Sequence, residues 1–227
     1  MSRGRRISRL KLNPPSSEAA YKYLSSWNGK QLFHDPSNFP PLSPESFSFP
    51  PKPFSIDIGC GSGEYLCNLA ASQPDENFLG IEISRRSIYQ AVNQAANFNL
   101  ENIHFLKADF HLLYPNLIDN SIKDASLLFP DPNYGSKNTK HRIFGTAFLD
   151  QLHPALTPGG RIKVLTDQEP FFEDMLQLGS NHPKYKSQAI ARHMNATGLP
   201  YPTRFQQAWE NIKRKFYYFE LIKLPVH

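Results

Sequence analysis

The segment Phe54–Gly63, FSIDIGCGSG, constrains the possible folds of this chain more than any other stretch. A short apolar run contains an acid near its end, Asp57, and leads directly into three glycines at alternate positions, Gly59, Gly61 and Gly63. Glycines permit a sharp turn and let backbone N–H groups approach a ligand closely. The pattern therefore predicts a buried strand that turns beneath a nucleoside-type ligand.

A second acid, Glu82, ends another apolar run, FLGIEIS, about twenty residues further along the chain. An acid at this distance suits the two hydroxyls of a ribose. A dinucleotide fingerprint is disfavoured, because it needs G-x-G-x-x-G and Glu64 stands where the last glycine would fall. We therefore expect a different adenosine-containing cofactor, bound to a doubly wound α/β domain.

From Phe54 onward the apolar pattern alternates between strands and helices, which predicts a largely parallel, Rossmann-like sheet. The predicted strands cover residues 54–58, 77–83, 103–108, 123–129 and 161–166, and the predicted helices cover residues 64–72, 84–97, 146–156 and 169–179. A turn is expected at residues 158–160. The final aromatic run, residues 213–224, predicts a late antiparallel strand.

We expect one α/β domain over residues 54–227, preceded over residues 1–53 by a basic tail and a proline-rich, irregular lead-in. Six prolines between residues 40 and 53 exclude a long helix there. Ser16 or Ser17 is placed to cap a short helix near residues 17–24.

Composition limits the class of protein. A chain of 227 residues can bury one full core. Because it contains no run of about eighteen apolar residues and no apolar signal-peptide segment, we expect no membrane span and a cytoplasmic location. Cys60 and Cys67 are too few for a disulfide framework, and no cluster of His, Cys and carboxylates has metal-ligand spacing. We therefore expect no metal site.

The net charge of +5 is unevenly distributed along the chain. The first eleven residues hold five basic groups and no acid, and residues 180–227 hold eight Lys or Arg against two Glu. Residues 12–179 hold eighteen acidic groups against twelve basic ones. An acidic middle tolerates a cationic cofactor, and basic ends suit a polyanion. A basic N-terminus is also typical of a solvated tail, and this alternative stays open.

Acids follow the predicted strands at one end of the sheet. Ligands of a doubly wound sheet bind outside the carboxyl ends of its strands. Five acids lie at or just beyond those ends: Asp57, Glu82, Asp109, Asp131 and Asp167. We expect them to rim one crevice.

The segment after the strand predicted over residues 123–129 indicates the substrate. It reads FPDPNYGSKNTKHRI, and Pro130 and Pro132 fix the backbone around Asp131. A basic run follows, and its members are Lys137, Lys140, His141 and Arg142. A rigid carboxylate beside a cationic loop suits a nucleobase whose phosphates need neutralising.

On these residues the chain resembles the bacterial tRNA (guanine-7-)-methyltransferases, a family of class I S-adenosylmethionine-dependent methyltransferases. The resemblance covers roughly residues 50–223. Its strongest markers are FPDP at 129–132, TD at 166–167 and PTRFQ at 202–206, whereas D-x-G-x-G-x-G marks only the superfamily.

The resemblance implies S-adenosylmethionine as the cofactor, tRNA as the partner and formation of 7-methylguanosine in the tRNA variable loop. It implies cofactor-binding roles for Asp57, Gly59, Gly61, Gly63, Glu82, Asp109 and Asp131, of which Asp131 is also the catalytic candidate. It implies substrate-binding roles for Asp167, Thr203, Arg204, Phe205 and Gln206, with the basic run contributing Lys137, Lys140 and Arg142. Whether the protein is a monomer or a homodimer stays open.

The chain departs from the family pattern at a few positions. Asp57 replaces a frequent glutamate, and Asn133 follows FPDP where tryptophan is usual. Gly135 aligns with a substrate-contacting lysine, and Gln206 replaces a glutamate, which keeps an acceptor but loses a charge. These changes leave the predicted fold and cofactor intact and bear on the contacts to the base.

Guanine N7 carries an in-plane lone pair, so its methylation needs no base to remove a proton. We therefore expect positioning and electrostatics to supply the rate, with Asp131 orienting the reactants and Asp167 on the guanine. One alternative is an exocyclic-amine methyltransferase with D/N-P-P-Y, which Asp131–Tyr134 matches except at one position. Another is a non-catalytic RNA-binding protein, which the retained cofactor acids disfavour.

Overall fold

The computed structural model describes residues 10–132, 142–194, 199–210 and 214–225. Its strands are β1 (Leu24–Ser26), β2 (Phe54–Ile58), β3 (Asn77–Glu82), β4 (Ile103–Lys107), β5 (Ile122–Leu128), β6 (Leu156–Thr166), β7 (Tyr185–Met194) and β8 (Phe216–Lys223). Its helices are α1 (Ser17–Tyr23), α2 (Gly29–His34), α3 (Glu64–Ser72), α4 (Arg85–Asn97), α5 (Thr146–Ala155), α6 (Glu169–Ser180) and α7 (Arg204–Glu210). Short 3₁₀ turns lie in the lead-in and between β4 and β5.

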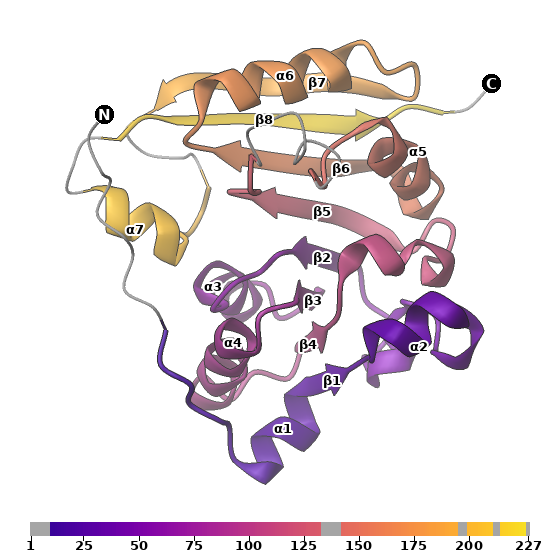
Figure 1. Ribbon diagram of the computed structural model, residues 1–227, viewed down its shortest axis with the longest axis vertical. Coiled ribbons are helices and arrows are strands. Elements are labelled where there is room, and N and C mark those ends of the chain that lie inside the picture. Colours follow the sequence, from indigo (N-terminus) through magenta and orange to yellow (C-terminus); the bar gives the residue numbers. More distant parts are fainter. Residues whose placement is uncertain (1–9, 133–141, 195–198, 211–213, 226–227) are drawn as a thin grey trace.

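The strands form one sheet in the order β1-β4-β3-β2-β5-β6-β8-β7 (Figure 1). Pairings from β1 to β6 are parallel, and β8 runs antiparallel to both β6 and β7. The order reverses at β2, whose neighbours are β3 and β5, so the crevice of a doubly wound sheet is expected at the carboxyl end of β2. The predicted Rossmann-like fold with a late antiparallel strand is confirmed.

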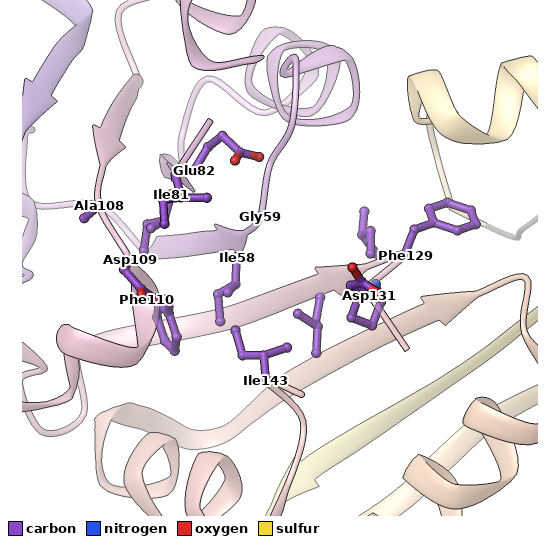
Figure 2. A pocket seen from close by; sticks show the side chains of 14 residues that line it. Ile58, Gly59, Ile81, Glu82, Ala108, Asp109, Phe110, Phe129, Asp131 and Ile143 are labelled. Atoms are coloured by element: carbon purple, nitrogen blue, oxygen red, sulfur yellow. The ribbon is translucent and has the colours of Figure 1, made fainter. Parts of the chain in front are cut away.

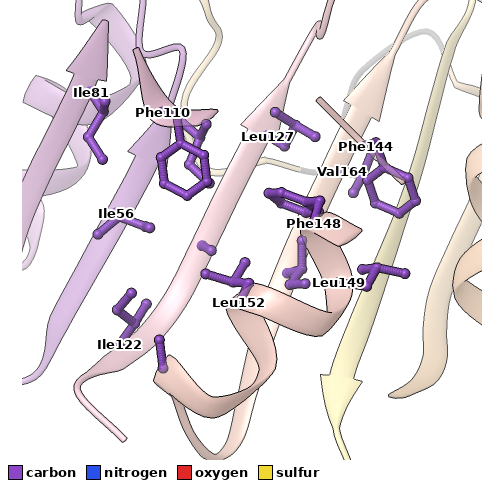
Figure 3. Packing of buried hydrophobic residues seen from close by; sticks show 14 of the residues in the cluster. Ile56, Ile81, Phe110, Ile122, Leu127, Phe144, Phe148, Leu149, Leu152 and Val164 are labelled. Carbon is purple, nitrogen blue, oxygen red and sulfur yellow. The ribbon is translucent and has the colours of Figure 1, made fainter. Parts of the chain in front are cut away.

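Helices cover both faces of the sheet, which explains why the central strands are almost continuously buried. On one face α1, α3 and α4 pack on side chains such as Phe78 and Phe105. On the other face α5 packs against β6 and α6 packs against β6, β7 and β8. In the core on this face, Phe148 meets Phe110 with ring centroids 6.2 Å apart (Figure 3). Among the described residues, no helix has the length and apolarity needed to cross a membrane.

The lead-in is more ordered than its prolines predict. Ser16 caps α1 by accepting a hydrogen bond from the Ala19 amide at 3.1 Å, as expected. The chain then forms β1, which pairs with β4 at the edge of the sheet, and buries Trp27, Leu32 and Leu42 in the main core. A three-residue strand has too short a pattern to be recognised in sequence. The lead-in therefore shares its core with the segment that follows residue 53.

The expected turn at residues 158–160 lies inside β6, as an irregularity in its pairing with β5. The register moves from Ile122 opposite Leu156 to Asp124 opposite Arg161, so extra residues are accommodated on β6. Gly159 has φ +73° there. The sequence also gave no signal for β7 or α7, whose polar and apolar residues do not follow a clear period.

Candidate active site

The glycine turn after β2 has open space beside it. Gly59 and Gly61 have φ +77° and +58°, and a Cβ built on either would meet no atom within 4 Å. Gly63 differs, because a Cβ there would lie 2.7 Å from the Cβ of Ala91 on α4. The first two glycines therefore leave room for a ligand against the backbone, whereas the third permits close packing of the turn on α4.

Glu82 lies at the end of β3, and hydrogen bonds hold its carboxylate against the glycine turn. Its Oε2 accepts from the Gly61 amide at 3.0 Å, and its Oε1 accepts from the Ser84 amide at 2.7 Å. Because each oxygen has a further lone pair, the fixed carboxylate can still accept from a pair of hydroxyls. This geometry suits the ribose role predicted from the sequence.

Asp57 is buried within β2 with 2 % of its surface exposed. Its Oδ1 has no hydrogen-bond partner in the described part of the chain. Burial, together with the negative charge of Glu82, raises the pKa of Asp57 to about 7. A buried carboxylate that lacks a donor is suited to a ligand that brings a positive charge or an N–H group.

A first cavity of about 250 Å³ opens at the carboxyl ends of β2, β3, β4 and β5 (Figure 2). Glu82 and Asp109 lie on one side of it, and Phe129 and Asp131 lie on the other. The Asp109 carboxylate is oriented by a hydrogen bond from the His111 amide at 3.0 Å. The remaining lining is mostly apolar and includes Ile58, Ile81, Ala108, Phe110 and Ile143. Such a cavity can bury a flat base while the acids hold its polar groups.

A second cavity of about 220 Å³ adjoins the first and shares Gly59, Leu128 and Phe129 with it. Its other walls come from the glycine turn, from Asp57 and Glu64, and from the segment 203–205. The fold thus brings Thr203, Arg204 and Phe205, predicted as substrate residues, next to the predicted cofactor turn.

Phe129 lines both cavities and has a backbone φ of +55°. Its amide bonds to the Leu165 carbonyl at 2.7 Å, and its ring packs on Phe205 with centroids 4.8 Å apart. A left-handed conformation in a non-glycine residue costs roughly 1 kcal/mol or more and is common where a side chain must be aimed. No pattern in the sequence marks Phe129 as a site residue, although it begins the FPDP motif.

The segment 203–206 forms the start of α7. The Thr203 hydroxyl oxygen accepts from the Gln206 amide at 3.0 Å, which caps the helix. Gln206 is buried, with 4 % of its surface exposed, and it lines neither cavity. Thr203, Arg204 and Phe205 are therefore better placed than Gln206 to meet a substrate.

Asp167 follows β6 and is held by two donors. Its Oδ2 lies 2.6 Å from an Arg214 guanidinium nitrogen and accepts from the Gln168 side-chain amide at 3.0 Å. Only 6 % of the Asp167 side chain is exposed. Sequence reasoning missed Arg214, because nothing local marks a residue just before β8 as the partner of a carboxylate after β6.

The Arg142 side chain makes contacts with other residues of the protein. Its Nε donates to the Pro132 carbonyl at 2.7 Å, its guanidinium lies 3.3 Å from Asp174, and it sits 4.9 Å above the Phe171 ring. These contacts fix the end of the segment after FPDP against α6, so a role of Arg142 in binding substrate stays a prediction. Lys137 and Lys140 lie outside the described residues.

Among the described residues, no group of three or more His, Cys, Asp or Glu side chains is arranged to hold a metal ion. Of the five acids expected to rim one crevice, Glu82, Asp109 and Asp131 line the first cavity, Asp57 lines the second, and Asp167 lines neither. Their arrangement fits contacts with several polar groups of an organic ligand.

The sequence is similar to a family described as a putative methyltransferase, whose model matches residues 51–219. A tRNA (guanine-N(7)-)-methyltransferase of Rubrobacter xylanophilus is 36 % identical over 219 residues, covering 96 % of this chain and 98 % of the relative. A tRNA (guanine-N(7)-)-methyltransferase of Chloroherpeton thalassium is 38 % identical over 221 residues, covering 97 % and 98 %.

Solved structures support the same fold. An rRNA methylase from Streptococcus thermophilus matches with a TM-score of 0.53 at 12 % identity, covering 77 % of this chain and 88 % of its own. A 16S rRNA (adenine(1408)-N(1))-methyltransferase from Catenulisporales acidiphilia matches with a TM-score of 0.55 at 13 % identity, covering 78 % and 90 %. At such identities the likeness shows the architecture alone.

Proposed function

Since this chain belongs to the tRNA (guanine-N(7)-)-methyltransferase family, we propose which of its residues carry out the methyl transfer and where in the tRNA it occurs. The protein is an S-adenosylmethionine-dependent enzyme that converts a guanosine of tRNA to 7-methylguanosine. The observation on which the site assignment rests is the junction at Phe129, where a cavity for the cofactor meets the substrate segment 203–205. The target guanosine is the one in the variable loop, and the enzyme works in the cytoplasm.

The residues of the crevice fit S-adenosylmethionine. The space beside Gly59 and Gly61, which a Cβ would fill, accepts the ligand against the backbone. Glu82 would hold the ribose hydroxyls, and Asp109 would hold the amino group of the adenine in the apolar first cavity. The unpartnered Oδ1 of Asp57 would bind the ammonium of the methionine portion.

The cofactor supplies an electrophilic methyl group on a sulfonium. Guanine N7 attacks with its in-plane lone pair, so the chain does not need a general base for the step. What the protein must supply is an in-line approach and stabilisation of the positive charge that develops on the base. A site rimmed by carboxylates is suited to this charge.

Asp131 is the residue proposed to orient the reactants. It lies in the first cavity opposite Glu82 and Asp109, at the end of β5 and next to Phe129 (Figure 2). Pro130 and Pro132 restrict its backbone, so the carboxylate is held in place before the substrate arrives. Its negative charge would stabilise the cationic 7-methylguanine as it forms.

The aromatic pair Phe129 and Phe205 is proposed to support the guanine. The two rings pack with an interplanar angle of 33° and line the second cavity. A base removed from the tRNA stack can lie against such rings. The basic ends of the chain, including Arg204 beside the cavity, would hold the tRNA phosphates.

The assignment is tested by incubating unmodified tRNA with the protein and methyl-labelled S-adenosylmethionine, followed by nucleoside analysis and mapping of the modified position. We expect label in 7-methylguanosine at one variable-loop guanosine. Label in an exocyclic amine of adenine or cytosine would favour the D/N-P-P-Y alternative. Absence of transfer, with tRNA still bound, would favour a non-catalytic RNA-binding protein.

A further inference from the structure

Arg214 and Asp167 form a fixed pair at the carboxyl edge of the sheet. Asp167 follows β6 directly, and Arg214 lies two residues before β8, which runs antiparallel to β6. Their guanidinium and carboxylate approach to 2.6 Å, while 30 % of the Arg214 side chain remains exposed. The pair therefore presents a negative and a positive group side by side at the carboxyl edge of the sheet, outside the linings of the two cavities described above.

The contacts of Asp167 are asymmetric. Both Arg214 and Gln168 bind its Oδ2, and no donor from the described part of the chain reaches Oδ1. One carboxylate oxygen is thus available to an N–H of a ligand, and the other is next to the guanidinium. The two side chains therefore present three groups in order: the acceptor Oδ1, the oxygen Oδ2 that is already bonded, and the donor N–H groups of the guanidinium.

Guanine carries the complementary line of groups on its Watson–Crick edge, namely a 2-amino donor, the N1–H donor and the O6 acceptor. A carboxylate satisfies the two donors but leaves O6 without a partner. Adenine presents an amino donor where guanine has O6, so an arginine at that place would face a second donor. A carboxylate–guanidinium pair therefore matches all three groups of the guanine edge. A carboxylate alone makes no contact with O6 and so does not distinguish the group at position 6.

We propose that Arg214 is a specificity-determining residue that donates a hydrogen bond to O6 of the target guanine, while its ion pair holds Asp167 so that Oδ1, with its two lone pairs, accepts from the N1–H and 2-amino donors. This inference rests on the proposed function of the same site.

The alternative is a purely structural role, in which Arg214 only neutralises the Asp167 carboxylate, whose side chain is 6 % exposed. The two explanations differ in what they predict for the base. A purely neutralising arginine is indifferent to the atom at position 6 of the substrate. An arginine that donates a hydrogen bond to the atom at position 6 makes the reaction sensitive to that atom. Removal of the arginine then abolishes this sensitivity.

The experiment is a cycle between enzyme and substrate variants. tRNAs are assembled with guanosine, 6-thioguanosine or inosine at the mapped target, because sulfur is a weaker acceptor than O6 and inosine lacks the 2-amino group. Values of kcat and KM are measured for the wild type, Arg214→Ala and Arg214→Lys. For the wild type we expect 6-thioguanosine to lower kcat/KM by about tenfold, the size of one hydrogen bond to a charged group.

For Arg214→Ala we expect a lower kcat/KM on guanosine and no further loss on 6-thioguanosine, while inosine still lowers it because Asp167 remains. Arg214→Lys should recover part of the sensitivity, since an ammonium also donates but lacks the planar fork. Lys184→Ala removes a cation from the exposed pair with Asp150 at 2.7 Å and serves as the control for charge. Thermal unfolding and calorimetry with S-adenosylmethionine check that every variant is folded and binds the cofactor.

Equal sensitivity to 6-thioguanosine in the wild type and in Arg214→Ala would overturn the inference. That outcome leaves the proposed function intact, because the wild type would still form 7-methylguanosine on normal tRNA. Failure of the wild type on normal tRNA would instead refute the proposed function itself. A variant that no longer unfolds cooperatively is replaced in the cycle by Arg214→Gln, which keeps a neutral donor of similar length and predicts an intermediate sensitivity.

Discussion

Replacing Asp57 with asparagine should stabilise the cofactor-free protein at alkaline pH while weakening cofactor binding. Asp57 is buried within β2, its Oδ1 lacks a partner among the described residues, and its pKa is raised to about 7 by burial and by Glu82. The folded protein therefore holds this proton more tightly than the unfolded chain, whose aspartate pKa is the ordinary 3.8. Stability is lost as the pH rises from the lower value toward the higher one.

The size of the effect follows from that shift. Each unit of pKa corresponds to about 1.36 kcal/mol, so the free energy of unfolding of the wild type should carry a penalty of roughly 2 kcal/mol at about pH 5 and roughly 4 kcal/mol at about pH 8. The difference between the two conditions is about 2–3 kcal/mol. Asparagine has no charge to bury, so this part of the pH dependence should disappear in Asp57→Asn.

The assay is urea unfolding of the cofactor-free wild type and variant at both pH values, with Asp75→Asn as a control at an exposed aspartate. The free energy of unfolding of Asp57→Asn minus that of the wild type should be larger at the alkaline pH than at the acidic pH by up to about 3 kcal/mol. Asp75→Asn should show no such change with pH. Calorimetry should show weaker S-adenosylmethionine binding by Asp57→Asn. A difference between wild type and variant that is the same at both pH values would refute the argument, because Asp57 would then be ionised in the folded state like an exposed acid.

Three further results are expected. Glu82→Ala removes the acceptor that is fixed by the Gly61 and Ser84 amides, so calorimetry should show a loss of S-adenosylmethionine affinity of about 2–4 kcal/mol in a folded variant; unchanged affinity would exclude Glu82 from the ribose. Asp131→Ala should abolish measurable transfer in the labelled-cofactor assay without unfolding the protein, and near wild-type turnover would leave Asp131 a structural role only. Deletion of residues 1–9 removes four arginines and spares Leu10, which lines the second cavity. Filter binding should then show weaker tRNA binding and a shallower dependence of the binding constant on salt concentration, with the same guanosine methylated. An unchanged salt dependence would mean that the segment is a solvated tail without a role in tRNA binding.

Much of the geometry around the glycine turn and the first cavity could be predicted from the sequence, because its residues lie in contiguous motifs. Three alternate glycines after an apolar run require positive φ angles, and the structure gives them +77°, +58° and +82°. The acids Glu82 and Asp109 end successive parallel strands, and parallel strands place their carboxyl ends at one edge. Local pattern and a general rule of the fold were sufficient to bring these residues together.

The remaining features depend on contacts between segments that are distant in the chain. The β1 edge strand is too short to have a pattern of its own and is stabilised by its pairing with β4. The left-handed conformation of Phe129 is held by the Leu165 carbonyl and the Phe205 ring, neither of which is near it in sequence.

The electrostatics of the site show the same division. Residue type and strand position in the sequence were sufficient to bring Glu82, Asp109 and Asp131 to one cavity, but not to show that Asp167 lines neither of the two cavities. Only the tertiary structure decided that Asp57 is buried with a raised pKa and that Asp167 is paired with Arg214. The physical reason is that the free energy of a charge depends on how much water and which opposite charges surround it, and both are set by the packing of strands and loops far apart in the chain.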